Sequence, residues 1–320
     1  MKPTTDLAAR VDAAQFPRET DSGGAFRRQE SRFRAWVKAD GSSAFAAEPG
    51  RYHLYVSSAC PWAHRAIIVR KLKKLEGVIG MTIVDPIRDD RGWAFTDAPD
   101  PINRFEFLRE AYFASDPAFE GRVTVPVLWD EKSGVVVNNE SAEIIRMLNS
   151  EFDAWGDAEL DLYPPPLRTE IDALNSRVYE TVNNGVYRAG FATSQNSYED
   201  AVRSLFASLE ELEERLASRR YLLGDVLTEA DWRLFTTLIR FDAVYHAHFK
   251  CNLRRLVDFP NLWSFVRELY QEPGIAETVD FDHIKRHYFV THRSINPTGI
   301  VPVGPELDLD LPHGRGGRNA

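Results

Sequence analysis

Cys60 is the residue of this chain whose type and position most clearly point to chemistry. It lies in the stretch SSACPWAHR, between an apolar strand-like run at 52–56 and a helix-like run at 63–70. Pro61 suits only the first turn of a helix, because proline lacks the backbone N–H that an interior position needs. Cys60 is therefore expected at or beside the helix N-cap, where free amides and the helix dipole favour a thiolate over a thiol. The pattern predicts thiol chemistry at Cys60, although a cysteine at a helix start can also be a small packed residue.

The residues around Cys60 indicate what kind of thiol chemistry this is. A stabilised thiolate is a slightly weaker nucleophile but a much better leaving group, which suits a transient mixed disulfide. A CxxC motif would place a second thiol at position 63, where this chain has Ala63. Cys251, the other cysteine, lies far along the chain and is expected to be structural. The resolving thiol is therefore expected from a small molecule, for which glutathione is the obvious candidate.

Two further motifs fit a short peptide ligand with charged ends. Pro126 opens a strand after the β-branched Val125, which is acceptable at an edge or with a cis peptide bond, and leaves the backbone of Val125 free to pair with a ligand. Ser141 at a helix start suits a carboxylate, while Glu140 suits an ammonium group. Taken alone, the Val125-Pro126 motif can also be interpreted as a rigid turn, and the Glu140-Ser141 motif as a helix cap.

A metal site is a competing interpretation of residues in the second half of the chain. His246, His248 and Cys251 resemble a ligand set, and His64 near Cys60 would add another. Side chains two residues apart on a helix point to different faces, and a tetrahedral zinc site needs convergent ligands. We therefore expect no metal.

Composition bounds the class of protein. The chain has 320 residues, of which 43% are hydrophobic and 27% charged, so it can form two cores. Its formal net charge of −9 argues against general nucleic-acid binding, which needs a basic face. Two cysteines make no disulfide framework, and the N-terminal sequence has no secretory signal or membrane-spanning run. The expectation is a cytoplasmic protein that binds neither nucleic acid nor membrane.

The order of predicted elements divides the chain. After the first strand and helix, a short apolar run at 78–84 predicts a second strand reached by a β-α-β crossover, and runs at 123–129 and 135–137 predict a hairpin before a helix at 142–152. Beyond three consecutive prolines, apolar positions recur at three- and four-residue spacing, which predicts helices at 168–183, 198–218, 228–243 and 261–271. Thr228-Glu229-Ala230-Asp231 reads as a capping box. The predicted organisation is an N-terminal extension at 1–50, an α/β domain at 51–152 with an insertion at 86–121, a linker at 153–167, an all-helical domain at 168–293 and a tail at 294–320.

This layout resembles a known architecture. A thioredoxin-like N-terminal domain followed by an all-α C-terminal domain, with a TEAD capping box, is similar to the soluble glutathione transferases. CPWAHR, the insertion with RGWAF, the NNES run, NNGVYRAGFA at 183–192 and HYFVTHRSINPTGIVPVGP at 287–305 resemble the Xi class, the glutathionyl-hydroquinone reductases. The resemblance extends from about residue 25 to residue 305, leaving the last fifteen residues without a counterpart.

The resemblance implies an enzyme and a set of site residues. It implies reduction of S-glutathionyl-hydroquinones to hydroquinones, with glutathione as reductant and oxidised glutathione as co-product. Cys60 then corresponds to the nucleophile, and Tyr187 and Tyr288 match tyrosines at the aromatic-substrate site. The residues that match the glutathione site are Trp93, Arg122, Val125, Pro126, Glu140 and Ser141.

Some of these assignments have alternatives. Tyr187 or Tyr288 would shuttle the proton that makes an aromatic carbon a tolerable leaving group. The alternative for each tyrosine, and for Trp93, is a packing role, and the alternative for Arg122 is a surface charge. Two other functions stay in play. The first is another cysteine-type enzyme of this superfamily, such as an Omega-like dehydroascorbate reductase or a general thioltransferase, which would not require the long insertion, the paired tyrosine motifs or the SINPTGIVPVGP run. The second is a non-catalytic ligand-binding relative, against which Cys60 argues. The resemblance also implies a homodimer.

Overall fold

The computed structural model describes residues 19–96 and 98–316, which divide into two compact units. Unit 1 comprises Gln29–Leu160 and Asp280–Val301. Unit 2 comprises Asp161–Val279, together with the described residues 19–28 and 302–316. This division follows spatial contacts, whereas the domain boundaries given above follow composition and stay a prediction.

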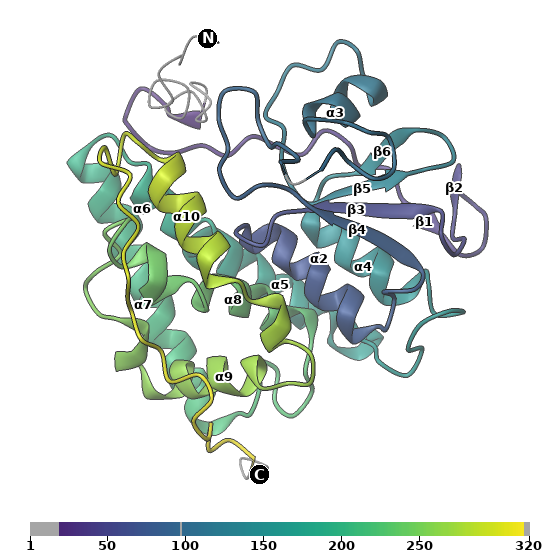
Figure 1. The fold of residues 1–320 in the computed structure, drawn as a ribbon. Coiled ribbons are helices and arrows are strands. Elements are labelled where there is room, and N and C mark those ends of the chain that lie inside the picture. Colours follow the sequence, from purple (N-terminus) through teal and green to yellow (C-terminus); the bar gives the residue numbers. More distant parts are fainter. Residues whose placement is uncertain (1–18, 97, 317–320) are drawn as a thin grey trace, which may run out of the picture. The chain divides into compact units, whose positions relative to one another are not determined.

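Unit 1 is built on a four-stranded mixed sheet (Figure 1). The strands are β3 (Tyr52–Val56), β4 (Ile79–Ile83), β5 (Val127–Asp130) and β6 (Val135–Asn138). Their order across the sheet is β4-β3-β5-β6, with β3 parallel to β4 and antiparallel to β5. The chain order of strand, helix, strand, hairpin and helix confirms the predicted thioredoxin-like arrangement.

Two helices cover one face of this sheet. They are α2 (Pro61–Leu72) and α4 (Ser141–Ser150), which lie side by side (Figure 1). All five residues of β3 are buried, which explains why this strand reads as a continuous apolar run rather than an alternating one. Pro61 takes the first helical position of α2, as its missing N–H and fixed φ favour.

The insertion at 86–121 is folded onto unit 1 by backbone pairing and one short helix. Leu108 N donates to Trp93 O at 2.9 Å and Phe95 N donates to Glu106 O at 3.0 Å, so the segment turns back on itself. It contains α3 (Arg109–Ser115), and Phe95 lies with its ring 5.6 Å from that of Tyr55 in β3. The insertion therefore adds an aromatic layer beside the sheet.

The remaining elements of unit 1 are small or come from distant parts of the chain. A parallel pair of two-residue strands is formed by β1 (Val37–Lys38) and β2 (Phe45–Ala46). The last helix, α10 (Phe281–Thr291), also belongs to unit 1. It is tied to the insertion, since Arg88 N donates to Thr291 Oγ1 at 3.3 Å.

The described part of unit 2 contains helices and no strand, as predicted for the second half. The helices are α5 (Arg168–Val178), α6 (Gly185–Gly190), α7 (Gln195–Ser218), α8 (Glu229–Leu238) and α9 (Pro260–Tyr270). Shorter turns are the π-helical Tyr179–Asn183 and Phe241–Tyr245 and the 3-10 turns Pro165–Leu167, Leu256–Asp258 and Ala276–Thr278. The capping box at Thr228 is confirmed: the Asp231 carboxylate accepts from Thr228 N at 2.9 Å.

Residues 302–316, which we call the C-terminal strap, contain neither helix nor strand but are anchored along α9 (Figure 1). Trp263 Nε1 donates to Asp308 Oδ1 at 2.9 Å, and Gln271 Nε2 donates to Leu309 O at 2.6 Å. Side-chain bonds rather than regular structure therefore hold this segment.

Arg315 provides the strongest anchor of the C-terminal strap. Its side chain is fully buried, and its Nε donates to Glu268 Oε2 at 3.1 Å. The guanidinium also donates at 2.6 Å to each of the carbonyls of Arg219 and Arg220, just after α7 ends. A buried arginine that reaches a carboxylate and free carbonyls joins the end of α7 to α9 and to the strap.

No helix within the described ranges is both long and apolar enough to cross a lipid bilayer.

Candidate active site

Cys60 is the N-cap residue of α2 and is partly exposed to solvent. Its backbone is extended, with φ −82° and ψ 122°, and its carbonyl accepts the first helical hydrogen bond from His64 N at 2.9 Å. Cys60 Sγ lies 3.6 Å from the carbonyl oxygen of Val125, a distance at which a thiol donates a weak hydrogen bond. The thiol is therefore accessible and lies at a helix start, where the positive end of the helix dipole favours a thiolate.

The chain opposite Cys60 is the turn that enters β5. The Val125–Pro126 peptide bond is cis, one of the two forms expected from the sequence, and both residues are buried. Tyr112 from α3 fixes the preceding residue, because its hydroxyl donates to Thr124 O at 2.8 Å and accepts from Thr124 N at 3.1 Å. This arrangement holds the Val125 backbone against the thiol.

Glu140 and Ser141 form the start of α4. Glu140 is the N-cap, and its Oε1 accepts from Ala142 N at 3.1 Å while its Oε2 accepts from Ser31 Oγ at 3.0 Å. Ser141 is buried, and its Oγ accepts from Arg65 NH1 at 3.3 Å. The helix start thus combines a carboxylate and a hydroxyl, and a guanidinium contacts the hydroxyl.

Trp93 and Arg122 lie in or beside the insertion. The Trp93 ring is buried and stacks on His287 of α10, with centroids 5.0 Å apart and planes tilted by 21°. His287 Nδ1 lies 2.6 Å from Pro86 O, which fixes the histidine ring. Arg122 is half-buried, three residues before Val125 in the turn that enters β5.

The two predicted tyrosines belong to different units. Tyr288 lies in α10 of unit 1, is almost fully buried and contacts the rings of His287 and His292 at 5.1 Å and 5.5 Å. Tyr187 lies in α6 of unit 2 and is 8% exposed. Unit 1 therefore brings Cys60, Val125, Pro126, Trp93, Arg122, Glu140, Ser141 and Tyr288 into one compact body, while Tyr187 belongs to the other.

Cys251 has a setting unlike that of Cys60. It is fully buried in unit 2, with its Sγ 4.0 Å from Val186 O, and burial raises the pKa of the Cys251 thiol. His248 is also buried, which lowers its pKa to about 4. Among the residues that the structure describes, no group of three or more His, Cys, Asp or Glu side chains could hold a metal ion.

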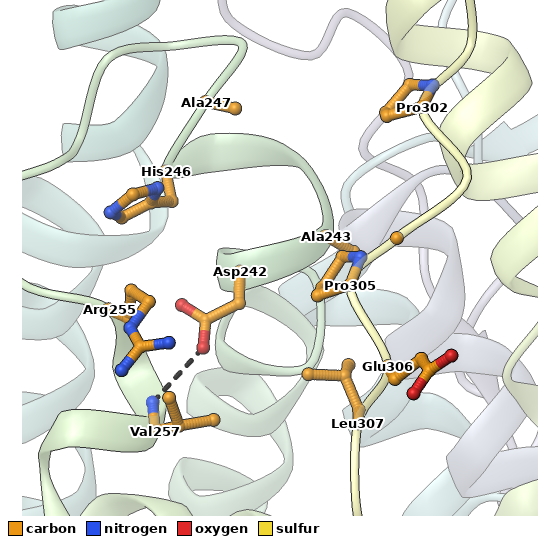
Figure 2. A pocket seen from close by; sticks show the side chains of 11 residues that line it. Asp242, Ala243, His246, Ala247, Arg255, Val257, Pro302, Pro305, Glu306 and Leu307 are labelled. Carbon is orange, nitrogen blue, oxygen red and sulfur yellow. Dashed lines mark hydrogen bonds between the residues drawn. The ribbon is translucent and has the colours of Figure 1, made fainter.

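Unit 2 also contains a pocket of about 310 Å³ between the turn at 241–245 and the C-terminal strap (Figure 2). Its lining includes His246, Asp242 and Arg255. The Asp242 carboxylate accepts from Leu256 N at 2.6 Å and from Val257 N at 3.1 Å, so both oxygens already cap a turn. The pocket contains none of the predicted site residues.

Family models match both halves of the chain. The glutathione S-transferase N-terminal domain matches residues 59–151, and the glutathione S-transferase C-terminal domain matches residues 195–268. Glutathionyl-hydroquinone reductase YqjG of Escherichia coli K12 is 56% identical over 92% of this chain and 93% of its own. Glutathionyl-hydroquinone reductase PcpF of Sphingobium chlorophenolicum is 53% identical over 90% of this chain and 92% of its own.

Solved structures give the same result. The glutathione-bound structure of E. coli YqjG has a TM-score of 0.87 at 56% identity, covering 89% of this chain and 97% of that one. Glutathione S-transferase Xi from Phanerochaete chrysosporium has a TM-score of 0.89 at 49% identity, covering 95% and 99%. The chain belongs to the Xi class of glutathione transferases, the glutathionyl-hydroquinone reductase family. This confirms the predicted family and its two-part fold.

Sequence reasoning missed part of the surroundings of the candidate site in this Xi-class transferase. Arg65 is buried, its guanidinium lies 4.5 Å from the Trp62 ring, and it contacts Ser141 from a position 76 residues earlier. Ser31, which donates to Glu140, comes from the segment predicted as an N-terminal extension. Only the position of Arg65, directly before the apolar run 66–69 of α2, could have pointed to the first contact, and no local signal indicates the second.

Proposed function

We propose that the chain reduces S-glutathionyl-hydroquinones through a mixed disulfide between Cys60 and glutathione. The observation that carries this is the partly exposed Cys60 thiol at the start of α2, 3.6 Å from the Val125 carbonyl. Free amides at a helix start stabilise the thiolate, which is the attacking form of cysteine. Among the described residues Cys251 is the other cysteine, and it is buried in unit 2, so it cannot serve as a resolving thiol beside Cys60 without unfolding.

The proposed reaction has two thiol steps. The Cys60 thiolate attacks the sulfur of the substrate, a disulfide forms, and the carbon–sulfur bond to the ring breaks. A second glutathione thiolate then attacks the glutathionyl sulfur, which releases oxidised glutathione and returns Cys60 as a thiolate. The sum converts one glutathionyl-hydroquinone and one glutathione into one hydroquinone and one oxidised glutathione.

Breaking the bond to an aromatic carbon requires a proton at that carbon. Tyr187 or Tyr288 would move a proton from a ring hydroxyl to the carbon that carries sulfur, which makes the keto tautomer. When sulfur is then removed, the bonding electron pair returns to the ring, which regains aromaticity, and the oxygen takes up a proton. Both tyrosines are buried among rings, which suits contact with a flat aromatic substrate.

Glutathione would be held by unit 1. The positive end of the α4 dipole and the Ser141 hydroxyl would receive the γ-glutamyl carboxylate, and Glu140 would offer a carboxylate to the ammonium group. The backbone of Val125 would pair with the peptide part of the tripeptide. Trp93 and Arg122, from the insertion and the turn before β5, would complete the site.

Mass spectrometry of the intact protein tests the proposal directly. After exposure to a glutathionyl-hydroquinone, the chain should gain the mass of one glutathionyl group, and Cys60→Ser should gain none. Turnover should be measured in parallel on a glutathionyl-hydroquinone, on dehydroascorbate and on a small glutathione mixed disulfide. Preference for dehydroascorbate, or an adduct that survives Cys60→Ser, would contradict the proposal.

We further propose that the enzyme acts as a homodimer in the cytoplasm and needs no metal. These points rest on the Xi-class membership and on the two free cysteines, since a reducing compartment keeps cysteines in the thiol form.

A further inference from the structure

The first described residues of the chain, 19–28, dock onto unit 2 at the start of α7. Thr193 N donates to Gly24 O at 2.9 Å, and Ser194 Oγ donates to Gly23 O at 2.8 Å. Gly24 has φ +83°, and a Cβ there would lie 2.9 Å from Ser194 N, so this close approach requires glycine. We call residues 19–28 the N-terminal segment.

The N-terminal segment ends with Arg28 on the face of Tyr187. Its guanidinium carbon lies 4.6 Å from the centroid of the Tyr187 ring and 5.3 Å from that of Phe26. Arg28 Nε donates to Asn184 Oδ1 at 2.8 Å, and Asn184 immediately precedes α6, the helix that carries Tyr187. The guanidinium is thus held by the same helix whose tyrosine it covers.

Three further neighbours of the Tyr187 ring within unit 2 are aromatic. Phe249, Tyr245 and Phe191 place their ring centroids 5.5 Å, 6.1 Å and 6.2 Å away. Flat apolar walls restrain the tilt of a ring, but they do nothing for a charge on its oxygen. A guanidinium over the ring face attracts the π system and also favours a negative charge on the phenol oxygen.

We propose that Arg28 is a positioning residue for Tyr187 in the reduction of glutathionyl-hydroquinones, an inference that rests on the proposed function. Tyr187 passes a proton to the ring carbon that carries sulfur and then takes one from the ring hydroxyl. Between these two transfers it is a phenolate. Arg28 acts through Tyr187, by holding its ring and by stabilising that phenolate.

The test compares Arg28→Gln and Arg28→Lys with Arg27→Gln. Arg27 is the neighbouring arginine, has a side chain 72% exposed and pairs with Asp21, so it controls for loss of a charge from this segment. We expect Arg28→Gln to lower kcat on a glutathionyl-hydroquinone about tenfold, the effect of one cation–π contact. The KM should change less than twofold, exchange with a small glutathione mixed disulfide should be unchanged, and Arg28→Lys should recover part of kcat.

A spectroscopic measurement tests the contact apart from activity. In protein labelled with ¹³C at tyrosine Cζ, the Tyr187 signal is identified by its loss in Tyr187→Phe. Arg28→Gln should shift this signal, and Arg27→Gln should leave it in place.

Four outcomes would overturn the inference. If Arg28→Gln has a normal kcat while Tyr187→Phe has a lowered kcat, the role of Tyr187 stands and the role of Arg28 does not. Equal losses on the aromatic and disulfide substrates, with a lower melting temperature, make Arg28 a packing residue only. Full turnover by Tyr187→Phe removes the tyrosine role as well, whereas full turnover by Cys60→Ser removes the proposed function itself.

Discussion

The two cysteines of this transferase show how position decides the chemistry of a side chain. Cys60 is partly exposed at the start of α2, while Cys251 is fully buried in unit 2, where burial raises the pKa of its thiol. A helix start supplies free amides that stabilise a thiolate, and an apolar interior penalises one. The setting of Cys60 therefore favours the nucleophile role proposed for it, whereas the setting of Cys251 favours an inert core residue.

The largest expected difference between the two regions is in turnover. Cys60→Ser should lower kcat on a glutathionyl-hydroquinone by at least about 10⁴-fold, because a hydroxyl cannot form the mixed disulfide. Cys251→Ala should change kcat by less than about twofold, since the buried thiol takes no part in the reaction. Steady-state assays of both variants measure the two kcat values. Comparable losses of kcat would show that the two cysteines do not differ in their role in turnover.

Alkylation should give the next largest difference. In the folded protein, iodoacetamide should modify Cys60 about 10³-fold faster than Cys251, because Cys251 must be exposed by local unfolding before it can react. Peptide mass mapping over time measures both rates. In denaturant the two rates should become similar, and early labelling of Cys251 in the native state would contradict its buried assignment.

The region of Cys251 should also make the fold sensitive to acid. His248 is neutral in the folded protein, with a pKa lowered to about 4 by burial, whereas in the unfolded chain it titrates near about 6.5. The unfolded state therefore binds the proton first, and stability falls as the pH falls from about 6.5 to about 4. His248→Gln should remove about 3 kcal/mol of this acid-induced loss of stability.

Urea unfolding of wild type and His248→Gln at several pH values measures this difference. His53 in unit 1 also has a pKa lowered to about 4 by burial, so some acid sensitivity should remain in the variant. An unchanged pH dependence in His248→Gln would show that this histidine takes up no proton on unfolding.

The smallest predicted effect sharpens the description of the Cys60 region. Glu140→Gln should raise the KM for glutathione about tenfold, because it removes the charge offered to the ammonium group. Glu143→Gln is the matched control, since Glu143 lies in the same first turn of α4 but pairs with Arg34. Equal effects of the two variants would assign both residues to helix capping rather than to glutathione.

The order of elements along the chain could be predicted from the sequence because each element has a local signal. Pro61 marked the start of α2, the apolar run at 52–56 marked β3, and the capping box at Thr228 marked α8. These signals act over a few residues, through backbone geometry and hydrophobic burial. The predicted roles of the site residues remain predictions.

Contacts between distant residues could not be predicted in the same way. Arg65 meets Ser141, and Arg28 meets Tyr187, through single side chains that leave no periodic pattern in the sequence. The C-terminal strap contains neither helix nor strand, so no periodic pattern in its sequence could indicate its contacts. Tertiary packing alone decides that Arg315 is buried there.

The anchoring of the C-terminal strap has a consequence for chain integrity. Arg315 lies near the end of the strap and donates to Glu268 and to the carbonyls that follow α7. A nonsense mutation shortly before codon 315 would therefore remove all of these hydrogen bonds together. Glu268, which is nearly inaccessible to water, would then lose one of its two ion pairs with described residues and keep the one with Arg220. A chain that ends shortly before Arg315 would therefore have a destabilised unit 2 and would be more susceptible to proteolysis, although it would still contain all the predicted site residues.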